Sequence, residues 1–280
     1  AGGATGALGT GAVVNNSILQ INRTGTVMVA NDISGTGTLT NIAAGTAILT
    51  GANSYSGTTT ITTGTLQIGA VGTTGTLGTG NVVNNAGLSF SRSDALTVDN
   101  VVSGTGTVTK LGTGTTTLTG ANTYSGITTV TTGTLQVGDG GTTGNLGTGA
   151  VTNNATLAFN RSDAITVANV ISGTGAVTQV GDGTTSLIGA NTYSGETTIS
   201  AGTLSVGAGG TTGALGTGAT TNNASLVFNR STALAVSSAI SGTGTVSQVG
   251  IGTTTLTGIN SYTGTTTISA GTLNVGGTGT

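Results

Sequence analysis

Apolar and polar residues alternate along short stretches of this chain. In the segments 88–91, 107–109 and 129–137, apolar residues alternate with polar ones, as at Leu88 and Phe90 or at Leu135 and Val137. A period of two is typical of β-strands with one buried face, whereas helices repeat every 3.6 residues. Glycine-rich breaks, such as those at Gly104 and Gly126, separate these stretches. The pattern therefore predicts an all-β chain of short strands joined by tight turns.

The whole pattern repeats at a fixed interval without an insertion. Its phase is set by an asparagine pair that recurs as Asn15-Asn16, Asn84-Asn85, Asn153-Asn154 and Asn222-Asn223, so the period is 69. Four copies account for 276 of the 280 residues. Self-similarity at a fixed period is typical of a stacked array, in which each unit buries its apolar face against the next. We therefore expect one continuous solenoid of four repeats, at 1–69, 70–138, 139–207 and 208–280.

Each repeat divides into three segments at its glycine-rich breaks. If the repeat is shared among three coils, each coil has roughly 23 residues. No segment is long enough for a crossover helix, so the strands are expected to lie one above another as a parallel β-solenoid. About twelve coils at a spacing of about 4.8 Å would make a rod roughly 58 Å long.

Composition narrows the class of protein. The chain has no Pro, Cys, His or Trp, and only 4% of its residues are charged. Low charge with abundant Thr, Val and Ile argues against intrinsic disorder. Glycine, at 54 residues, falls at fixed turn positions, and without Pro or a strict three-residue period it does not indicate collagen. A structural β protein is the class that remains.

Charge and hydropathy exclude a nucleic-acid partner and a membrane span. The net charge is −2 and only five residues are Lys or Arg, which excludes a nucleic-acid-binding surface. No apolar run of about 18 residues is present, so no membrane span is expected in this segment. No basic and apolar leader opens the chain. An export signal, if the protein is secreted, is expected outside this segment.

The few aromatic residues are regularly placed. Phenylalanine shares strand parity with Leu88 and Val98 and is expected in the core, with Ile21 in its place in repeat 1. Tyrosine is expected to cover a corner of each repeat, with stacking against carbohydrate as the alternative. The positions are Phe90, Phe159 and Phe228, and Tyr55, Tyr124, Tyr193 and Tyr262.

One charge, an arginine, recurs in every repeat. An acid follows two residues later only in the middle repeats, as Asp94 and Asp163, and a catalytic pair would not lose its acid in half of the copies. We therefore expect each arginine to bond carbonyls at a coil corner, with successive arginines roughly 14 Å apart at three coils per repeat. Lys110 has no charged counterpart and is assigned no role. The arginines are Arg23, Arg92, Arg161 and Arg230.

No constellation for catalysis or metal binding is found. Asp139 and Asp182 lie in glycine-rich turns that faintly resemble calcium loops, but neither recurs in the other repeats, and a calcium solenoid needs its carboxylate in every turn. Seven scattered acids without histidine supply no acid–base pair and no base for a Ser or Thr nucleophile. We expect no enzymatic activity, no catalytic residue, no metal and no cofactor.

The stretch Leu118–Gly126, continued by Thr132–Gly138, resembles the autotransporter-associated β-strand repeat of secreted passenger regions in Gram-negative bacteria. The other copies start at Leu49, Leu187 and Leu256, and the last departs at Ile259 and Thr263. The resemblance covers under half of each repeat. It implies a right-handed parallel β-helix, export to the cell surface, and a role as a stalk or an adhesive surface.

Two classes of function stay open. The first is a structural stalk or fibre of the bacterial cell surface. Because neither end shows a polar cap, the chain is expected to be a slice of a longer array or a subunit that stacks head to tail on itself into a filament. The second is a binding module whose Thr-rich strands, such as 58–60 and 115–117, form a flat face for ice or glycan. A cell-surface glycan or protein is a further candidate partner.

Overall fold

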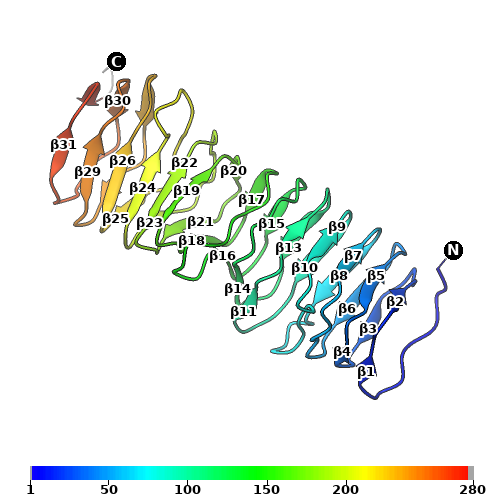
Figure 1. Ribbon diagram of the computed structural model, residues 1–280. Coiled ribbons are helices and arrows are strands. Elements are labelled where there is room, and N and C mark those ends of the chain that lie inside the picture. Colours follow the sequence, from blue (N-terminus) through cyan, green and yellow to red (C-terminus); the bar gives the residue numbers. More distant parts are fainter. Residues whose placement is uncertain (1, 277–280) are drawn as a thin grey trace. The chain divides into compact units, whose positions relative to one another are not determined.

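The computed structural model describes residues 2–276, which form short parallel strands joined by turns and loops (Figure 1). Within these residues no helix is long and apolar enough to cross a membrane. Ala1 and residues 277–280, which the predicted first and last repeats include, lie outside the described residues. The predicted all-β parallel solenoid is confirmed, with about 13 turns in all.

Contacts divide the chain into two compact units. The first comprises the residues up to Leu135 together with Gly144–Gly149, and the second comprises Gln136–Thr143 and the residues from Ala150 on. One strand, β16 (Thr134–Val137), has residues in both. The strands of the first unit are β1 (Val13–Val14), β2 (Ile18–Ile21), β3 (Val27–Val29), β4 (Ile33–Ser34), β5 (Thr38–Asn41), β6 (Thr46–Leu49), β7 (Thr59–Ile61), β8 (Thr65–Ile68), β9 (Val82–Asn84), β10 (Gly87–Phe90), β11 (Leu96–Val98), β12 (Val102–Ser103), β13 (Thr107–Lys110), β14 (Thr115–Leu118) and β15 (Thr128–Val130).

The second unit has the same kinds of strand in the same order. They are β17 (Val151–Asn153), β18 (Thr156–Phe159), β19 (Ala164–Val167), β20 (Ile171–Ser172), β21 (Ala176–Gln179), β22 (Thr184–Leu187), β23 (Thr197–Ile199), β24 (Thr203–Val206), β25 (Thr220–Asn222), β26 (Ser225–Phe228), β27 (Leu234–Val236), β28 (Ile240–Ser241), β29 (Thr245–Gln248), β30 (Thr253–Leu256), β31 (Thr266–Ile268) and β32 (Thr272–Val275).

The coils of the first unit have three faces. One face stacks β2, β5, β7, β9 and β12, and the next stacks β3, β6, β8, β10, β13 and β15. The third face begins with β1 and β4 and continues with β11 and β14. Between β4 and β11 it consists of non-strand segments, since Ser54 N–H donates to Ile33 O over 2.8 Å and Asn53 Nδ2 donates to Thr76 O over 2.7 Å. Each coil thus supplies one segment to each face.

The second unit is built in the same way. Its longest stacks are β19, β22, β24, β26, β29 and β31 on one face, and β18, β21, β23, β25 and β28 on another. The remaining face has β17 and β20, and then β27, β30 and β32.

The repeat is longer than three coils. On one face, Leu19 is followed by its successive register partners Leu39, Thr59 and Val82, so the chain completes three coils between Leu19 and Val82. A short segment then carries it around a corner to Leu88, the counterpart of Leu19, which pairs with β8 on the next face. A repeat therefore equals about three and a third coils. The expectation of three coils was wrong because register partners on neighbouring strands are mostly 20 positions apart, as Leu19 and Leu39 are.

The core of each unit consists of rows of small apolar side chains. In the first unit one row is nearly inaccessible to solvent along its whole length. Each fully buried Val or Leu stabilises the fold by about 1.5–3 kcal/mol, and alternate residues of the same strands, mostly Thr and Ser, face outward. Phe90, Phe159 and Phe228 are fully buried, which confirms their predicted place. The row contains Val27, Ala47, Leu66, Leu88, Val108 and Thr128.

Tyrosine belongs to this core as well. Tyr124 is 1% exposed, and its hydroxyl lies 2.8 Å from Thr128 Oγ1. Its ring packs on the backbone of Gly147, where an added Cβ would lie 2.5–2.6 Å from two ring carbons. Tyr55 and Tyr193 have the same burial and equivalent partners. These three rings fill space inside the solenoid and are not accessible to a ligand, so the alternative of carbohydrate stacking is wrong for them.

Candidate functional site

The recurrent arginines tie loops to coil corners, as predicted. Arg92 Nη1 donates to Gly75 O over 3.0 Å, and the two residues are 17 positions apart in the sequence. Its Nε and Nη2 form a bidentate pair with the Asp94 carboxylate, at 2.7 and 2.6 Å. The hydrogen bonds from Arg92 hold the pKa of Asp94 below its usual value. Since Arg92 is only 11% exposed, this pair is a structural clamp.

The other arginines make equivalent bonds to different acceptors. Arg161 Nη2 donates to Thr142 O over 2.6 Å and also pairs with Asp163. Where the acid is missing in repeat 4, Arg230 donates to Thr232 Oγ1 over 2.8 Å and to Gly213 O over 2.7 Å. In repeat 1, Arg23 bonds to Gly6 O.

The expected stacking of successive arginines, roughly 14 Å apart on the same corner, is wrong. Arg23 follows β2, whereas Arg92 follows β10, which stacks on the next face. Because a repeat exceeds three coils by about one face, the two residues lie at different corners of the first unit. The prediction failed because it divided 69 by three.

Lys110 has a role that the sequence did not reveal. It is fully buried at the end of β13, and its Nζ donates to Gly112 O and, over 3.5 Å, to Thr132 O. Gln179 and Gln248, at the equivalent position, donate to the matching glycine carbonyl over 2.7 Å each. At this position either Lys or Gln supplies the N–H donor that the glycine carbonyl of the turn accepts. Burial lowers the pKa of the Lys110 ammonium because the charged form is desolvated.

The acidic turns do not assemble a metal centre. Asp139 accepts a bond from Gly141 N–H over 3.3 Å and is exposed, as is Asp182. Among residues 2–276 no group of three or more His, Cys, Asp or Glu side chains is placed to hold an ion.

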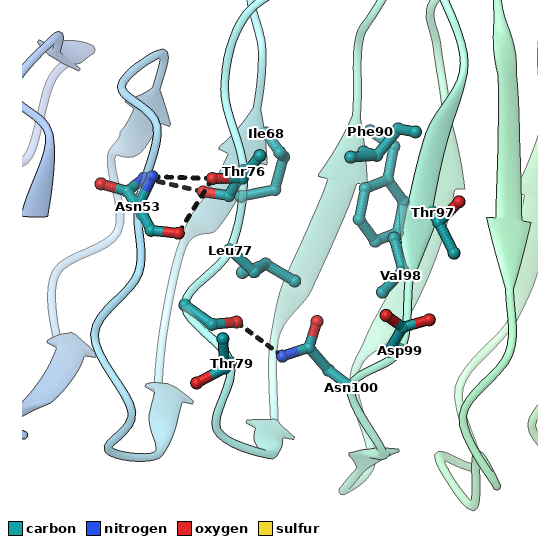
Figure 2. Close-up of a pocket in the computed structure, with 12 residues that line it drawn as sticks. Asn53, Ile68, Thr76, Leu77, Thr79, Phe90, Thr97, Val98, Asp99 and Asn100 are labelled. Carbon is teal, nitrogen blue, oxygen red and sulfur yellow. Dashed lines mark hydrogen bonds between the residues drawn. The ribbon is translucent and has the colours of Figure 1, made fainter. Parts of the chain in front are cut away.

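The most site-like feature is a cavity of about 270 Å³ in the first unit, which we call the β11 slot (Figure 2). It lies between the segment Thr76–Thr79 and strand β11. β11 is an edge strand of its sheet, paired with β14 on one side. Thr119 N–H donates to Val98 O over 3.1 Å, so in a parallel ladder the N–H and C=O of Thr97 face the opposite side, toward the slot.

Hydrogen bonds bridge the two segments that flank the β11 slot at both of its ends. At one end, Arg92 bonds to Gly75, and Val71 N–H donates to Ser91 O over 2.7 Å. At the other end, Asn100 Nδ2 donates to the carbonyls of Gly78 and Gly80, over 2.8 and 2.6 Å.

The lining of the β11 slot is partly apolar and partly polar. Leu77, Leu96 and Val98 are among its apolar side chains, and Thr79, Thr97, Asp99 and Asn100 supply hydroxyl, carboxylate and amide groups. One Asp99 oxygen accepts the Thr119 hydroxyl. Neither Arg nor Lys lines the slot. Such a surface suits a small, neutral, partly polar molecule.

Related cavities accompany the equivalent strands of repeats 1 and 4. The cavity at β3 has about 260 Å³ and that at β27 about 100 Å³. Their polar groups differ, because Ala30 and Ser237 replace Asp99. In repeat 4, Ser238 replaces Asn100, and its buried Oγ has no partner among the described residues. The β11 slot alone of these three combines the carboxylate with the amide.

Comparison with known proteins identifies the repeat. The passenger-associated-transport-repeat family matches residues 44–68, 108–137, 177–206 and 246–275. The chain carries four copies of this repeat. Each match ends in two consecutive strands on different faces, such as β15 and β16, and includes the recurrent tyrosine and its threonine partner. This confirms the resemblance seen in the segment Leu118–Gly138.

A second comparison concerns a protein from Brucella suis biovar 1 (strain 1330) described as the adhesin BmaC autotransporter. It is 58% identical to this chain over 87 residues, which are 31% of this chain. The matched region is 2% of that protein, so the chain spans a small part of its relative. No solved structure shows significant similarity to the chain.

Proposed function

We propose that this chain is part of the extracellular passenger of an adhesin-type autotransporter, in which it forms a structural β-solenoid at the cell surface. The observation that carries the proposal is the match of four passenger-associated transport repeats to a chain of stacked parallel coils. The relative described as an autotransporter adhesin supports the same role.

The bonding of the polar side chains supports a structural role rather than a chemical one. The arginines, Lys110 and the buried tyrosines all use their polar atoms to hold turns and core contacts. We therefore propose that the chain has no enzymatic activity. Hydrolysis of a broad glycan or peptide panel by the purified chain, above a buffer blank, would overturn this part.

Surface labelling tests the localisation and attachment tests the adhesive role. In bacteria that produce the natural protein, an antibody against this segment should stain intact cells, and in-frame removal of the segment should lower attachment to host cells or abiotic surfaces. Restoring the segment should restore both signals. Staining that appears only after lysis would contradict the proposal, whatever the attachment result.

A second candidate is the Thr-rich binding face, for ice or glycan. One outward row of the second unit supports it, since Thr184, Thr203, Ser225 and Thr245 lie in register on successive coils. The neighbouring row is less regular, because Val227 interrupts it. Inhibition of ice recrystallisation at micromolar protein would favour this candidate. Head-to-tail stacking of copies is the finer form of the structural proposal, and electron microscopy of the purified chain tests it, with isolated short particles as the contrary result.

A further inference from the structure

We propose that the β11 slot binds one neutral sugar residue of a glycan, an inference that rests on the proposed surface role for the source of that glycan. The slot lies wholly within the first unit and is built from a buried amide, an exposed carboxylate and an unpaired strand edge.

The buried amide of Asn100 supplies the first contact. Asn100 is 9% exposed, and its Nδ2 is used by two backbone carbonyls. Its Oδ1 receives no hydrogen bond from the described residues, and Figure 2 shows this oxygen directed into the space beside Leu77 and Val98. An amide oxygen accepts hydrogen bonds, so a ligand hydroxyl entering the slot could donate to it.

Two further groups converge on the same space. The backbone N–H and C=O of Thr97 face the slot because β11 has no strand partner there within the described part of the chain. Asp99 also lines the slot; one of its carboxylate oxygens accepts the Thr119 hydroxyl on the β14 side, and the other is not used by that bond. Together these groups offer three acceptors and one donor, which matches the hydroxyl-rich edge of a pyranose.

Size and polarity then select the ligand class. A volume of about 270 Å³ holds one sugar ring and not a long substituent. The apolar side chains of Leu77, Leu96 and Val98 suit the C–H face of the ring. An anionic sugar is disfavoured because no cation lines the slot and Asp99 would repel it.

An extended peptide is the rival occupant, since it could pair with the free edge of β11. The slot favours the sugar because its two flanking segments are bridged at both ends, by the Arg92–Gly75 bond and by the bond of Asn100 to Gly78. A strand added to β11 would have to break one of these ties.

Saturation-transfer NMR on the purified chain tests the proposal. The probes are the methyl glycosides of glucose, mannose, galactose and N-acetylglucosamine, together with a soluble Thr-Val-Thr-Val peptide. We expect transfer to at least one sugar, with a dissociation constant on the order of 1 mM for a ligand of this size. Asp99→Ala, which installs the residue of repeats 1 and 3, should weaken that binding at least about tenfold.

Ser237→Ala is the matched control, because Ser237 holds the place of Asp99 in the smaller cavity of repeat 4. It should leave sugar binding unchanged, and an unchanged circular dichroism spectrum and melting temperature should show that both variants fold. No transfer to any sugar at 10 mM probe (about ten times the expected constant), equal transfer in Asp99→Ala, or transfer to the peptide alone would overturn the inference. Surface staining of intact cells does not depend on sugar binding by the slot. The sugar-binding proposal can therefore be contradicted while the proposed function stands.

Discussion

At the scale of single residues, the solenoid depends on a few polar groups that are buried and satisfied. Tyr124 fills the core through its ring and closes a hydrogen bond to Thr128. Burial raises the pKa of the Tyr124 phenol, so this hydroxyl stays protonated and can donate at ordinary pH. Lys110 satisfies a turn that Gln satisfies in other repeats.

The tyrosine bond has a measurable effect on stability. Tyr124→Phe should cost about 1–2 kcal/mol of unfolding free energy, because it leaves the buried Thr128 hydroxyl without its partner. Adding Thr128→Val should recover most of the loss. Tyr262→Phe is the control, since the bond of Tyr262 to Thr266 is exposed and should contribute less. Urea denaturation followed by circular dichroism measures all three, and an equal loss at Tyr124 and Tyr262 would contradict the argument.

Lys110 should make stability depend on pH. Its folded pKa is below the unfolded value of 10.5, so the unfolded chain binds more protons between the two values. Stability from this residue therefore increases as pH rises through the folded pKa toward 10.5. Lys110→Gln, which installs the residue of repeats 3 and 4, should remove that increase and be at least as stable at neutral pH. The difference in melting temperature between the unchanged chain and Lys110→Gln, measured from pH 7 to about 10.5, isolates the effect. A difference that stays constant over this range would contradict the prediction.

At the scale of strands, the length of each coil sets which side chains meet. Register partners are mostly 19 or 20 positions apart, and they are 22 or 23 apart across coils that carry the loop before Thr76 or its equivalents. Each such loop is tied back by an arginine, as Gly75 is by Arg92. The added residues are therefore accommodated outside the ladder, and the strand pairing continues in register.

A pair of cysteines can test this register. Thr40 and Thr60 face outward and are direct partners on neighbouring strands, so Thr40→Cys with Thr60→Cys should form a disulfide under mild oxidation. Thr40→Cys with Thr63→Cys has the spacing of the longer coils and should stay reduced. Thiol titration and a gel shift distinguish the two, and the reverse result would show that the pairing is wrong.

At the scale of the whole molecule, the repeat is the natural unit of insertion and deletion. Removing residues 70–138 joins two equivalent positions, so every remaining strand meets a partner like its own. The shortened chain should keep a β-rich spectrum and cooperative unfolding. Removing a segment nine residues shorter, 70–129, joins non-equivalent positions and should abolish cooperative unfolding. Similar unfolding curves for both deletions would contradict the argument.

Much of this architecture could be predicted from the sequence. The alternation around Leu88 and Phe90 indicated half-buried strands, and the unbroken spacing of Asn84 and its equivalents indicated stacked coils. The coil length could not be read, because strands of two to four residues leave the position of each corner undetermined. The β11 slot was also missed. Asn100 is a corner asparagine like those of repeats 1 and 3, and only the structure shows that its oxygen has no donor.

The extra third of a coil has a consequence for growth of the array. Adding one repeat within a stack displaces the coils beyond it along the axis and also rotates them by a third of a turn, since each counterpart strand moves to the next of three faces. The original heading returns only after three additions. Gene duplications that lengthen such a protein would therefore change the direction in which its distal parts face. Repeat number would control this orientation as well as the length.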